Sequence, residues 1–277
     1  MKHFAVIGNP IVHSLSPAMY AKVFCDFGLN ADHQALQVRH DSLSELMLTM
    51  RNGDIDGLNV TIPYKQAVIQ FLDEIDEYAK DIGAVNCISA KNGKLKGYNT
   101  DWIGFIQSLK QLNIINIPNR HFVVVGAGGA ASAVVYGLVQ KKAKSIFIIN
   151  RTETKAISLK NRFADADIQV MQWENIPNNI LNSAIIVNGT SVGMSPNINQ
   201  CPVPKDYIKS GQIAVDIIYS PLWTQFRKLY SEIGGKSISG MPMLVLQGLA
   251  AMDIWYDKPL SKQINVLDLI HYLEKKL

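Results

Sequence analysis

The chain has 277 residues, and at about 150 residues per domain this length predicts two domains. Apolar residues make up 48% of it and charged residues 18%, which is typical of a globular chain, and its 19 glycines and 11 prolines are too few for a collagen-like or low-complexity sequence. The net charge of +4 is too small to predict a nucleic-acid binder, although it would suit a small anionic ligand.

The cysteines and the N-terminus indicate the compartment. Cys25, Cys87 and Cys201 lie far apart and form no metal-binding pattern, which predicts reduced thiols and no metal site. The apolar run before Asn9-Pro10 is too short for a signal peptide, and no apolar stretch is long enough to span a membrane. We therefore expect a soluble protein of the cytoplasm.

The first part of the chain alternates short apolar runs with helical patterns. Ser16 and Pro17 predict a helix start with Ser16 at the N-cap, and Asn92-Gly93 predicts a tight turn before a short edge strand. In chain order, we predict strands at 4–7, 33–38, 57–61, 84–89 and 94–98, and helices at 16–28, 42–50 and 101–109.

The second part has a more regular alternation of strands and helices, which predicts a parallel sheet covered on both faces. Trp223, Phe226 and Tyr230 follow one another at helical spacing and are expected to be core residues or to line a domain boundary. The predicted strands are 121–125, 145–149, 168–171, 184–188, 213–217 and 236–239, and the predicted helices are 130–140, 153–163, 243–256 and 266–275.

A glycine-rich loop follows the strand Val123–Val125, with the sequence Gly126-Ala127-Gly128-Gly129-Ala130. Gly126 permits a tight turn, Gly128 lets the backbone approach a pyrophosphate, and the helix N-terminus supplies N–H groups and a positive dipole end. Ala131 replaces the usual third glycine and is small enough for close packing of helix on strand. This strand–loop–helix context predicts a dinucleotide site.

The next strand ends in Asn150-Arg151-Thr152, where an NAD-binding site usually carries an acidic residue. A guanidinium there can hold a phosphate with two hydrogen bonds and lie flat on adenine. Lys155 follows four residues later and would share a helical face with Arg151 if the helix had begun. The sequence therefore favours NADP over NAD.

A later turn, Asn188-Gly189-Thr190-Ser191, also follows a strand. Because ligands of such sheets bind beyond the carboxyl ends of the strands, Thr190 and Ser191 are candidates for contact with the ribose or the nicotinamide. Taken alone, the segment favours an ordinary turn.

Three polar clusters stand out in the first part of the chain. Ser14 and Ser16 place two hydroxyls at a helix start, which suits a carboxylate. Asn59-Val60-Thr61 leaves a strand with polar side chains on one face, and Lys65 follows. Asn86 interrupts an apolar strand, while Asp101 begins a helix and is equally interpretable as a simple cap.

Together these motifs resemble the shikimate dehydrogenase family along nearly the whole chain. The segments that carry the resemblance are Ser14-Leu15-Ser16-Pro17, Asn59-Val60-Thr61-Ile62-Pro63-Tyr64-Lys65, Gly83-Ala84-Val85-Asn86, Tyr98-Asn99-Thr100-Asp101-Trp102-Ile103-Gly104, Gly126-Ala127-Gly128-Gly129-Ala130, Asn150-Arg151-Thr152, Tyr219-Ser220-Pro221 and Gln247-Gly248.

The resemblance implies an NADPH-dependent reduction of 3-dehydroshikimate to shikimate on an α/β fold with two α/β domains. It implies a substrate domain of residues 1–102 plus 242–277, with the C-terminal helices packing back on it, and a Rossmann-type NADP domain of residues 103–241. The implied residues are Lys65 and Asp101 for catalysis; Ser14, Ser16, Asn59, Thr61, Asn86, Tyr219 and Gln247 for the substrate; and Gly126, Ala127, Gly128, Gly129, Ala130, Asn150, Arg151, Thr152, Lys155, Thr190, Ile217 and Gly240 for NADP.

Other functions stay open at this stage. One is a quinate/shikimate dehydrogenase that uses NAD, which Arg151 disfavours. Another is an NADP-binding regulator without activity, which the pair Lys65 and Asp101 disfavours. A folate-type dehydrogenase would not need the serine pair. The sequence leaves both a monomer and a homodimer open.

Overall fold

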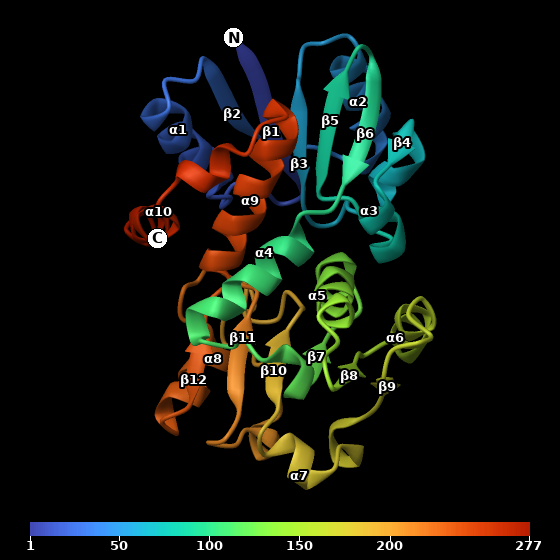
Figure 1. Cartoon of the computed structure of the whole chain (residues 1–277), viewed down its shortest axis with the longest axis vertical. Coiled ribbons are helices and arrows are strands. Elements are labelled where there is room, and N and C mark those ends of the chain that lie inside the picture. Colours follow the sequence, from blue (N-terminus) through green and yellow to red (C-terminus); the bar gives the residue numbers. More distant parts are fainter. The chain divides into compact units, whose positions relative to one another are not determined.

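The chain folds around two six-stranded sheets. The computed structural model describes residues 1–277 and divides them into two units. The first unit comprises Met1–Asp101 and Val245–Lys276, and the second comprises Trp102–Leu244 with the last residue, Leu277. In Figure 1 the first unit runs from blue to cyan and returns in orange and red, while the second runs from green to orange.

The sheet of the first unit is mixed, with the strand order β2-β1-β3-β5-β6-β4. β1 pairs in parallel with β2 and β3, whereas β3, β5 and β6 pair antiparallel. Asn92 and Gly93 both have positive φ, as the predicted tight turn between β5 and β6 requires. The strands are β1 (Lys2–Gly8), β2 (Ala31–Gln37), β3 (Gly57–Val60), β4 (Glu74–Ile75), β5 (Cys87–Lys91) and β6 (Lys94–Tyr98).

The prediction of an edge strand at 94–98 is wrong, because β4 pairs with its outer side. β4 has two residues, so it shows no alternation that a sequence pattern could detect. Asn86 also does not interrupt a strand, since β5 begins at the following residue, Cys87.

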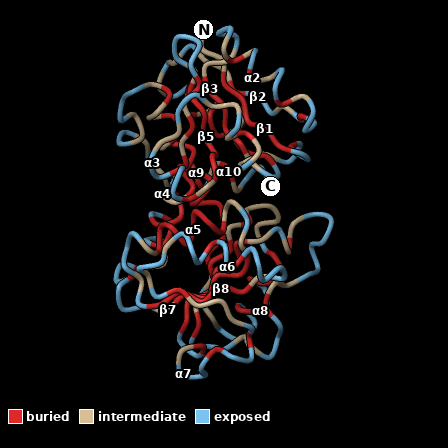
Figure 2. The backbone as a smooth tube through the Cα atoms, turned by 90° about the vertical axis from the view of Figure 1, so that its right-hand side faces the viewer, coloured by how far each residue is buried: buried red, intermediate tan, exposed pale blue.

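Helices cover both faces of this sheet. Ala5, Ile7, Leu58 and Val60 belong to one buried cluster with Met47 of α2. Figure 2 shows that the buried residues of this unit follow its strands. The helices are α1 (Ser16–Asp26), α2 (Leu43–Arg51), α3 (Glu77–Ile82), α10 (Val266–Glu274) and the part of α9 (Met241–Tyr256) from Val245 onward.

The C-terminal segment completes the core of the first unit, as predicted. Trp255 of α9 stacks on Phe4 with ring centroids 4.5 Å apart, and its Nε1 donates to the carbonyl of Ile88 at 3.0 Å. A Cβ on Gly57 would lie 2.4 Å from that indole nitrogen, so the glycine is what lets the ring reach the sheet. Figure 1 shows α9 and α10 beside β1 and α1.

The sheet of the second unit is entirely parallel, as predicted, with the order β12-β11-β10-β7-β8-β9. This is a doubly wound arrangement in which the strand order reverses between β7 and β10, the place where such sheets bind ligands. The strands are β7 (His121–Val125), β8 (Ser145–Ile149), β9 (Ile168–Val170), β10 (Ile185–Asn188), β11 (Ile213–Asp216) and β12 (Lys236–Ile238).

Two apolar clusters occupy the two faces of this sheet, one around Phe122 and Val124 and the other around Val123 and Phe147. Trp223 is not a core residue, because it precedes the N-cap Thr224 and is 48% exposed, whereas Phe226 and Tyr230 are buried. The helices are α4 (Asp101–Ser108), whose first residue belongs to the first unit, α5 (Gly129–Gln140), α6 (Glu153–Asn161), α7 (Asn178–Leu181) and α8 (Gln225–Glu232).

Short 3₁₀ turns complete the chain. None of its helices combines the length and the apolar character that crossing a bilayer requires. The 3₁₀ turns are His40–Ser42, Ala67–Phe71, Leu109–Leu112, Ile117–Asn119, Trp173–Asn175, Lys205–Tyr207 and Leu260–Gln263.

Candidate active site

Lys65 and Asp101 form an ion pair in the first unit. Lys65 Nζ lies 2.5 Å from Asp101 Oδ2, and the two side chains are 13% and 6% exposed. Asp101 begins α4, while Lys65 follows β3 after a turn. The ammonium has no other hydrogen-bond partner in the protein, so two of its N–H groups are available to a ligand.

Asn86 is the centre of a buried network around this pair. Its Nδ2 donates to Asp101 Oδ1 at 2.8 Å, to Thr100 Oγ1 at 3.0 Å and to Gln247 Oε1 at 3.1 Å. Its Oδ1 accepts the backbone N–H of Thr100 at 2.7 Å. Sequence reasoning expects Asn86 to contact a ligand, and in the structure its amide also fixes the Asp101 carboxylate.

Asn59 is tied to a histidine that the sequence analysis does not single out. His33 Nε2 lies 3.2 Å from Asn59 Oδ1, both side chains are buried, and Asn59 Nδ2 has no hydrogen-bond partner. Burial lowers the pKa of His33 to about 4, although the hydrogen bond to Asn59 opposes this shift. The ring is therefore neutral at pH 7, and Asn59 holds an unused donor. Only tertiary contacts reveal this pair, because the two residues come from different strands.

The serine pair lies at the start of α1. Leu15, not Ser16, is the N-cap residue, so the predicted cap is wrong by one position. Ser14 Oγ instead accepts the N–H of Ser16 at 3.3 Å, a local turn that draws the backbone of the two residues together. Ser16 is buried, and neither its hydroxyl nor that of Thr61 donates to a protein group.

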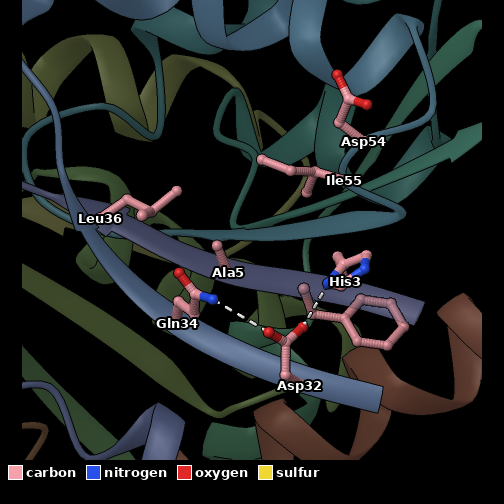
Figure 3. A pocket seen from close by; sticks show the side chains of 8 residues that line it. His3, Ala5, Asp32, Gln34, Leu36, Asp54 and Ile55 are labelled. Carbon is pink, nitrogen blue, oxygen red and sulfur yellow. Dashed lines mark hydrogen bonds and ion pairs between the residues drawn. The ribbon is translucent and has the colours of Figure 1, made fainter. Parts of the chain in front are cut away.

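The pocket in Figure 3 is a different place in the first unit. It has a volume of about 150 Å³ and lies against β1 and β2. Three of its four polar side chains pair with one another, His3 with Asp32 at 2.9 Å and Gln34 with Asp32 at 3.0 Å, while Asp54 stands apart. None of the predicted site residues lines it, so the polar cluster around Asp101 remains the candidate site.

The second unit carries the glycine loop at the reversal of strand order. Gly126 has φ +114, a conformation that favours glycine, and a Cβ there would lie 2.9 Å from Thr190 Cγ2. Gly128 is the N-cap of α5, no side chain caps that helix, and a Cβ on Gly128 would meet open space. Ala131 of α5 packs against Gly189, since a Cβ on Gly189 would lie 2.9 Å from the Cβ of Ala131. Both positions therefore need a small residue. This loop fits a pyrophosphate.

The segment after β8 is exposed and cationic. Arg151 has no hydrogen bond or ion pair within the protein, and no acidic residue stands at Asn150, Arg151 or Thr152. Asn150 Nδ2 donates to the carbonyl of Thr152 at 2.7 Å. Because α6 begins at Glu153, Arg151 precedes the helix, and its spacing to Lys155 does not place the two on one helical face. An unpaired guanidinium at this position fits the 2′-phosphate of NADP.

The remaining predicted residues lie at the same edge of the second sheet. Thr190 follows β10, and Ile217 and Tyr219 follow β11. A Cβ on Gly240 would lie 2.0 Å from the carbonyl oxygen of Ile217, so these two predicted cofactor residues are in contact. Asp216, at the end of β11, is buried and was not predicted, although an acidic residue ending an apolar strand is a signal in the sequence.

The predicted residues thus fall into two groups. Ser14, Ser16, Asn59, Thr61, Lys65, Asn86, Asp101 and Gln247 belong to the first unit, whereas Tyr219 and the predicted cofactor residues belong to the second.

Comparisons with known proteins agree along the chain. The family profile described as the shikimate dehydrogenase substrate binding domain matches residues 6–88, and the profile described as shikimate / quinate 5-dehydrogenase matches residues 108–217. The chain is 36% identical over 281 residues to the shikimate dehydrogenase (NADP(+)) of Caldicellulosiruptor saccharolyticus, covering 100% of both chains. It is 40% identical over 253 residues to that of Aquifex aeolicus, covering 91% of this chain and 90% of the other.

A solved structure gives the same result for the fold. Shikimate 5-dehydrogenase from Thermus thermophilus, in complex with NADP(H) and shikimate, has a TM-score of 0.89 and 32% identity, with 100% of each chain covered.

Proposed function

This chain belongs to the shikimate dehydrogenase family, and on that basis we propose how its own residues divide the work of the reaction. It is an NADP-dependent oxidoreductase that reduces 3-dehydroshikimate to shikimate in the shikimate pathway. The first unit binds the substrate and carries the proton chemistry, and the second unit binds the cofactor.

The buried pair of Lys65 and Asp101 carries this proposal. NADPH, when bound, supplies a hydride to the carbonyl carbon, so the carbonyl oxygen must receive a proton. Lys65 donates that proton in reduction and takes it back in oxidation, through an N–H that no protein group occupies. Asp101 holds the ammonium at 2.5 Å and orients a substrate hydroxyl, while Asn86 keeps its carboxylate in place.

The other polar side chains of the first unit bind the substrate. Ser14 and Ser16 hold the carboxylate at the start of α1. Asn59 and Thr61 bind ring hydroxyls, which the unpartnered Nδ2 of Asn59 supports. Asn86 and Gln247, whose side chains are hydrogen-bonded to each other, complete the set.

The second unit holds the cofactor along the carboxyl edge of its sheet. Gly126, Ala127, Gly128, Gly129 and Ala130 surround the pyrophosphate at the N-terminus of α5. Asn150, Arg151, Thr152 and Lys155 bind the adenosine half with its 2′-phosphate, and Thr190, Ile217 and Gly240 line the nicotinamide half. We place the enzyme in the cytoplasm, because its three cysteines are all unpaired thiols, as a reducing compartment favours.

A spectrophotometric assay of nicotinamide absorbance tests the function. The purified protein is given shikimate or quinate, each with NADP or NAD, and we expect the highest kcat/KM with shikimate and NADP. A preference for quinate or NAD would identify the broader quinate/shikimate activity instead. Binding of NADPH without any turnover of 3-dehydroshikimate would refute the enzymatic function and identify a regulator.

A further inference from the structure

Asp216 is a buried carboxylate that the proposed chemistry does not use. It ends β11, is 1% exposed, and accepts hydrogen bonds from three neutral donors: Asn188 Nδ2 at 3.0 Å, the backbone N–H of Ile218 at 3.1 Å and Thr224 Oγ1 at 2.6 Å. Burial raises its pKa to about 6 against the lowering effect of these bonds. Burying a carboxylate costs free energy, which its hydrogen bonds offset only in part. We therefore ask what these hydrogen bonds hold in place.

The bond to Asn188 connects Asp216 to the loop after β10. Asn188 Oδ1 accepts both the N–H of Thr190 at 3.1 Å and the Thr190 hydroxyl at 2.7 Å. Asn188 Nδ2 donates to the carbonyl of Val192 at 3.1 Å, and Thr190 Oγ1 accepts the N–H of Val192 at 3.1 Å. Both polar atoms of the Asn188 side chain are therefore engaged, and they tie the loop to Asp216.

The same carboxylate also fixes the segment after β11. It accepts the N–H of Ile218, and the carbonyl of Ile218 accepts the N–H of Gly240 at 2.8 Å. Asp216 is thus connected to two segments by hydrogen bonds. Through Asn188 it reaches Thr190, which packs against Gly126, and through the Ile218 N–H it reaches the contact between Ile217 and Gly240. These four residues are the ones assigned above to the pyrophosphate turn and the nicotinamide half.

We infer that Asp216 is a positioning residue for NADP: acting through Asn188 and the Ile218 N–H, it holds the two segments that form the nicotinamide end of the cofactor site. This inference rests on the proposed function, because it takes Thr190, Ile217 and Gly240 as cofactor contacts. Asp216 itself touches no ligand and moves no proton.

Gln212 provides a matched control at the opposite end of the same strand. It is 1% exposed, donates to the carbonyls of Leu181 and Tyr207 at 2.9 Å each, and accepts from the Tyr230 hydroxyl at 2.6 Å. It is thus a buried hydrogen-bonding centre like Asp216, but at the amino end of β11. If Asp216 served only to stabilise the fold, its loss and the loss of Gln212 should affect NADPH binding alike. If it positions the cofactor site, only the loss of Asp216 should weaken NADPH binding.

The experiment compares Asp216→Ala, Asn188→Ala, the double variant, Asp216→Asn and Gln212→Ala. The dissociation constant of NADPH is measured by its fluorescence without substrate, below the Tm of every variant. We expect it to rise about tenfold in Asp216→Ala and in Asn188→Ala, the loss of roughly one hydrogen bond, and no further in the double variant. Asp216→Asn should restore most of the affinity, because an amide can accept from Asn188 and Ile218 and donate to Thr224.

Two further measurements separate positioning from general destabilisation. Amide hydrogen exchange of the ligand-free protein should increase at residues 189–193 and 217–219 in Asp216→Ala. Gln212→Ala should lower the Tm but leave the NADPH affinity within about twofold, and KM for 3-dehydroshikimate should stay constant in all variants.

An unchanged NADPH affinity in both Asp216→Ala and Asn188→Ala would overturn the inference, and so would an equal loss in Gln212→Ala. Additive losses in the double variant would contradict the path through Asn188. If Asp216→Ala does not fold, Asn188→Ala and Asp216→Asn still decide the matter through affinity and exchange. A wild-type protein that neither binds NADPH nor reduces 3-dehydroshikimate would instead refute the proposed function, before any variant is made.

Discussion

Each unit contains a buried aspartate that accepts a hydrogen bond from an asparagine side chain, and the two pairs serve different purposes. Asn86 donates to Asp101 at 2.8 Å, and Asn188 donates to Asp216 at 3.0 Å. The other oxygen of Asp101 meets the ammonium of Lys65, whereas that of Asp216 meets the hydroxyl of Thr224. A cation with free N–H groups makes the first pair suitable for proton transfer. The second aspartate accepts its hydrogen bonds from the neutral donors Asn188, Ile218 and Thr224, and the charge of Arg227 adds to them, which suits a fixed support.

The largest effect is expected in the first pair, which we propose transfers the proton. Lys65→Ala and Asp101→Asn should each lower kcat by a factor of about 10² or more, because the proton transfer to the substrate oxygen is lost or misaligned. Steady-state rates at saturating NADPH and 3-dehydroshikimate measure this.

The matched control is Lys91→Ala, whose ion pair with Asp257 at 3.4 Å is exposed. We expect its kcat to equal that of the wild type, since exposed pairs contribute little. Near wild-type turnover in both Lys65→Ala and Asp101→Asn would contradict the proposal that Asp101, unlike Asp216, takes part in proton transfer.

The buried His33 of the first unit and the buried Asp216 of the second should also change stability with acid in opposite directions. In the first, the pKa of His33 falls from 6.5 to about 4 on folding, so stability is lost as the pH falls from 6.5 toward 4. In the second, the pKa of Asp216 rises from 3.8 to about 6, so stability is gained as the pH falls from 6 toward 3.8. Between pH 7 and pH 5, these effects are about 2 kcal/mol lost and about 1 kcal/mol gained.

Denaturant unfolding gives the free energy of unfolding of the wild type and of each variant at pH 7 and pH 5. The change between the two pH values is then compared among the proteins. His33→Phe keeps a ring beside Tyr20, whose centroid lies 4.4 Å from that of His33, and it should lose less stability on acidification than the wild type. Asp216→Asn should lose more. Identical pH dependence in all three proteins would show that neither group changes its pKa on folding.

A smaller effect is expected at Arg151, which we propose binds one substituent of the cofactor, the 2′-phosphate. Arg151→Ala should raise KM for NADP by roughly tenfold to a hundredfold and leave KM for NAD nearly constant, since a hydrogen bond to a charged group contributes about 1.5–3 kcal/mol. Initial rates with both cofactors measure the ratio. An equal rise in KM for NAD and for NADP would contradict binding of the 2′-phosphate by Arg151.

Local patterns in the sequence were enough to predict much of both units. The glycine loop at Gly126 and the parallel alternation of the second unit follow from periodicity and from the backbone freedom of glycine. β4 escaped prediction because two residues carry no period. The N-cap of α1 was misplaced because Leu15 occupies that position and no side chain caps the helix, which a preference for serine at N-caps could not indicate.

The supporting residues were harder to predict than the chemical ones. Lys65 and Asp101 stand in motifs that the family resemblance identifies, whereas His33 and Asp216 acquire their roles from partners on other strands, Asn59 and Asn188. Burial and hydrogen bonding between distant segments are properties of the folded chain, so composition and spacing do not express them.

Trp255 of α9 packs against Gly57 and Phe4 near the start of the chain, and this affects the order in which the two units can fold during synthesis. The second unit is contiguous up to Leu244, and its last strand ends at Ile238, so its whole sheet can form while the C-terminal residues are still on the ribosome. The first unit begins the chain but lacks part of its core until α9 has emerged. The domain translated first is therefore the one that is completed last.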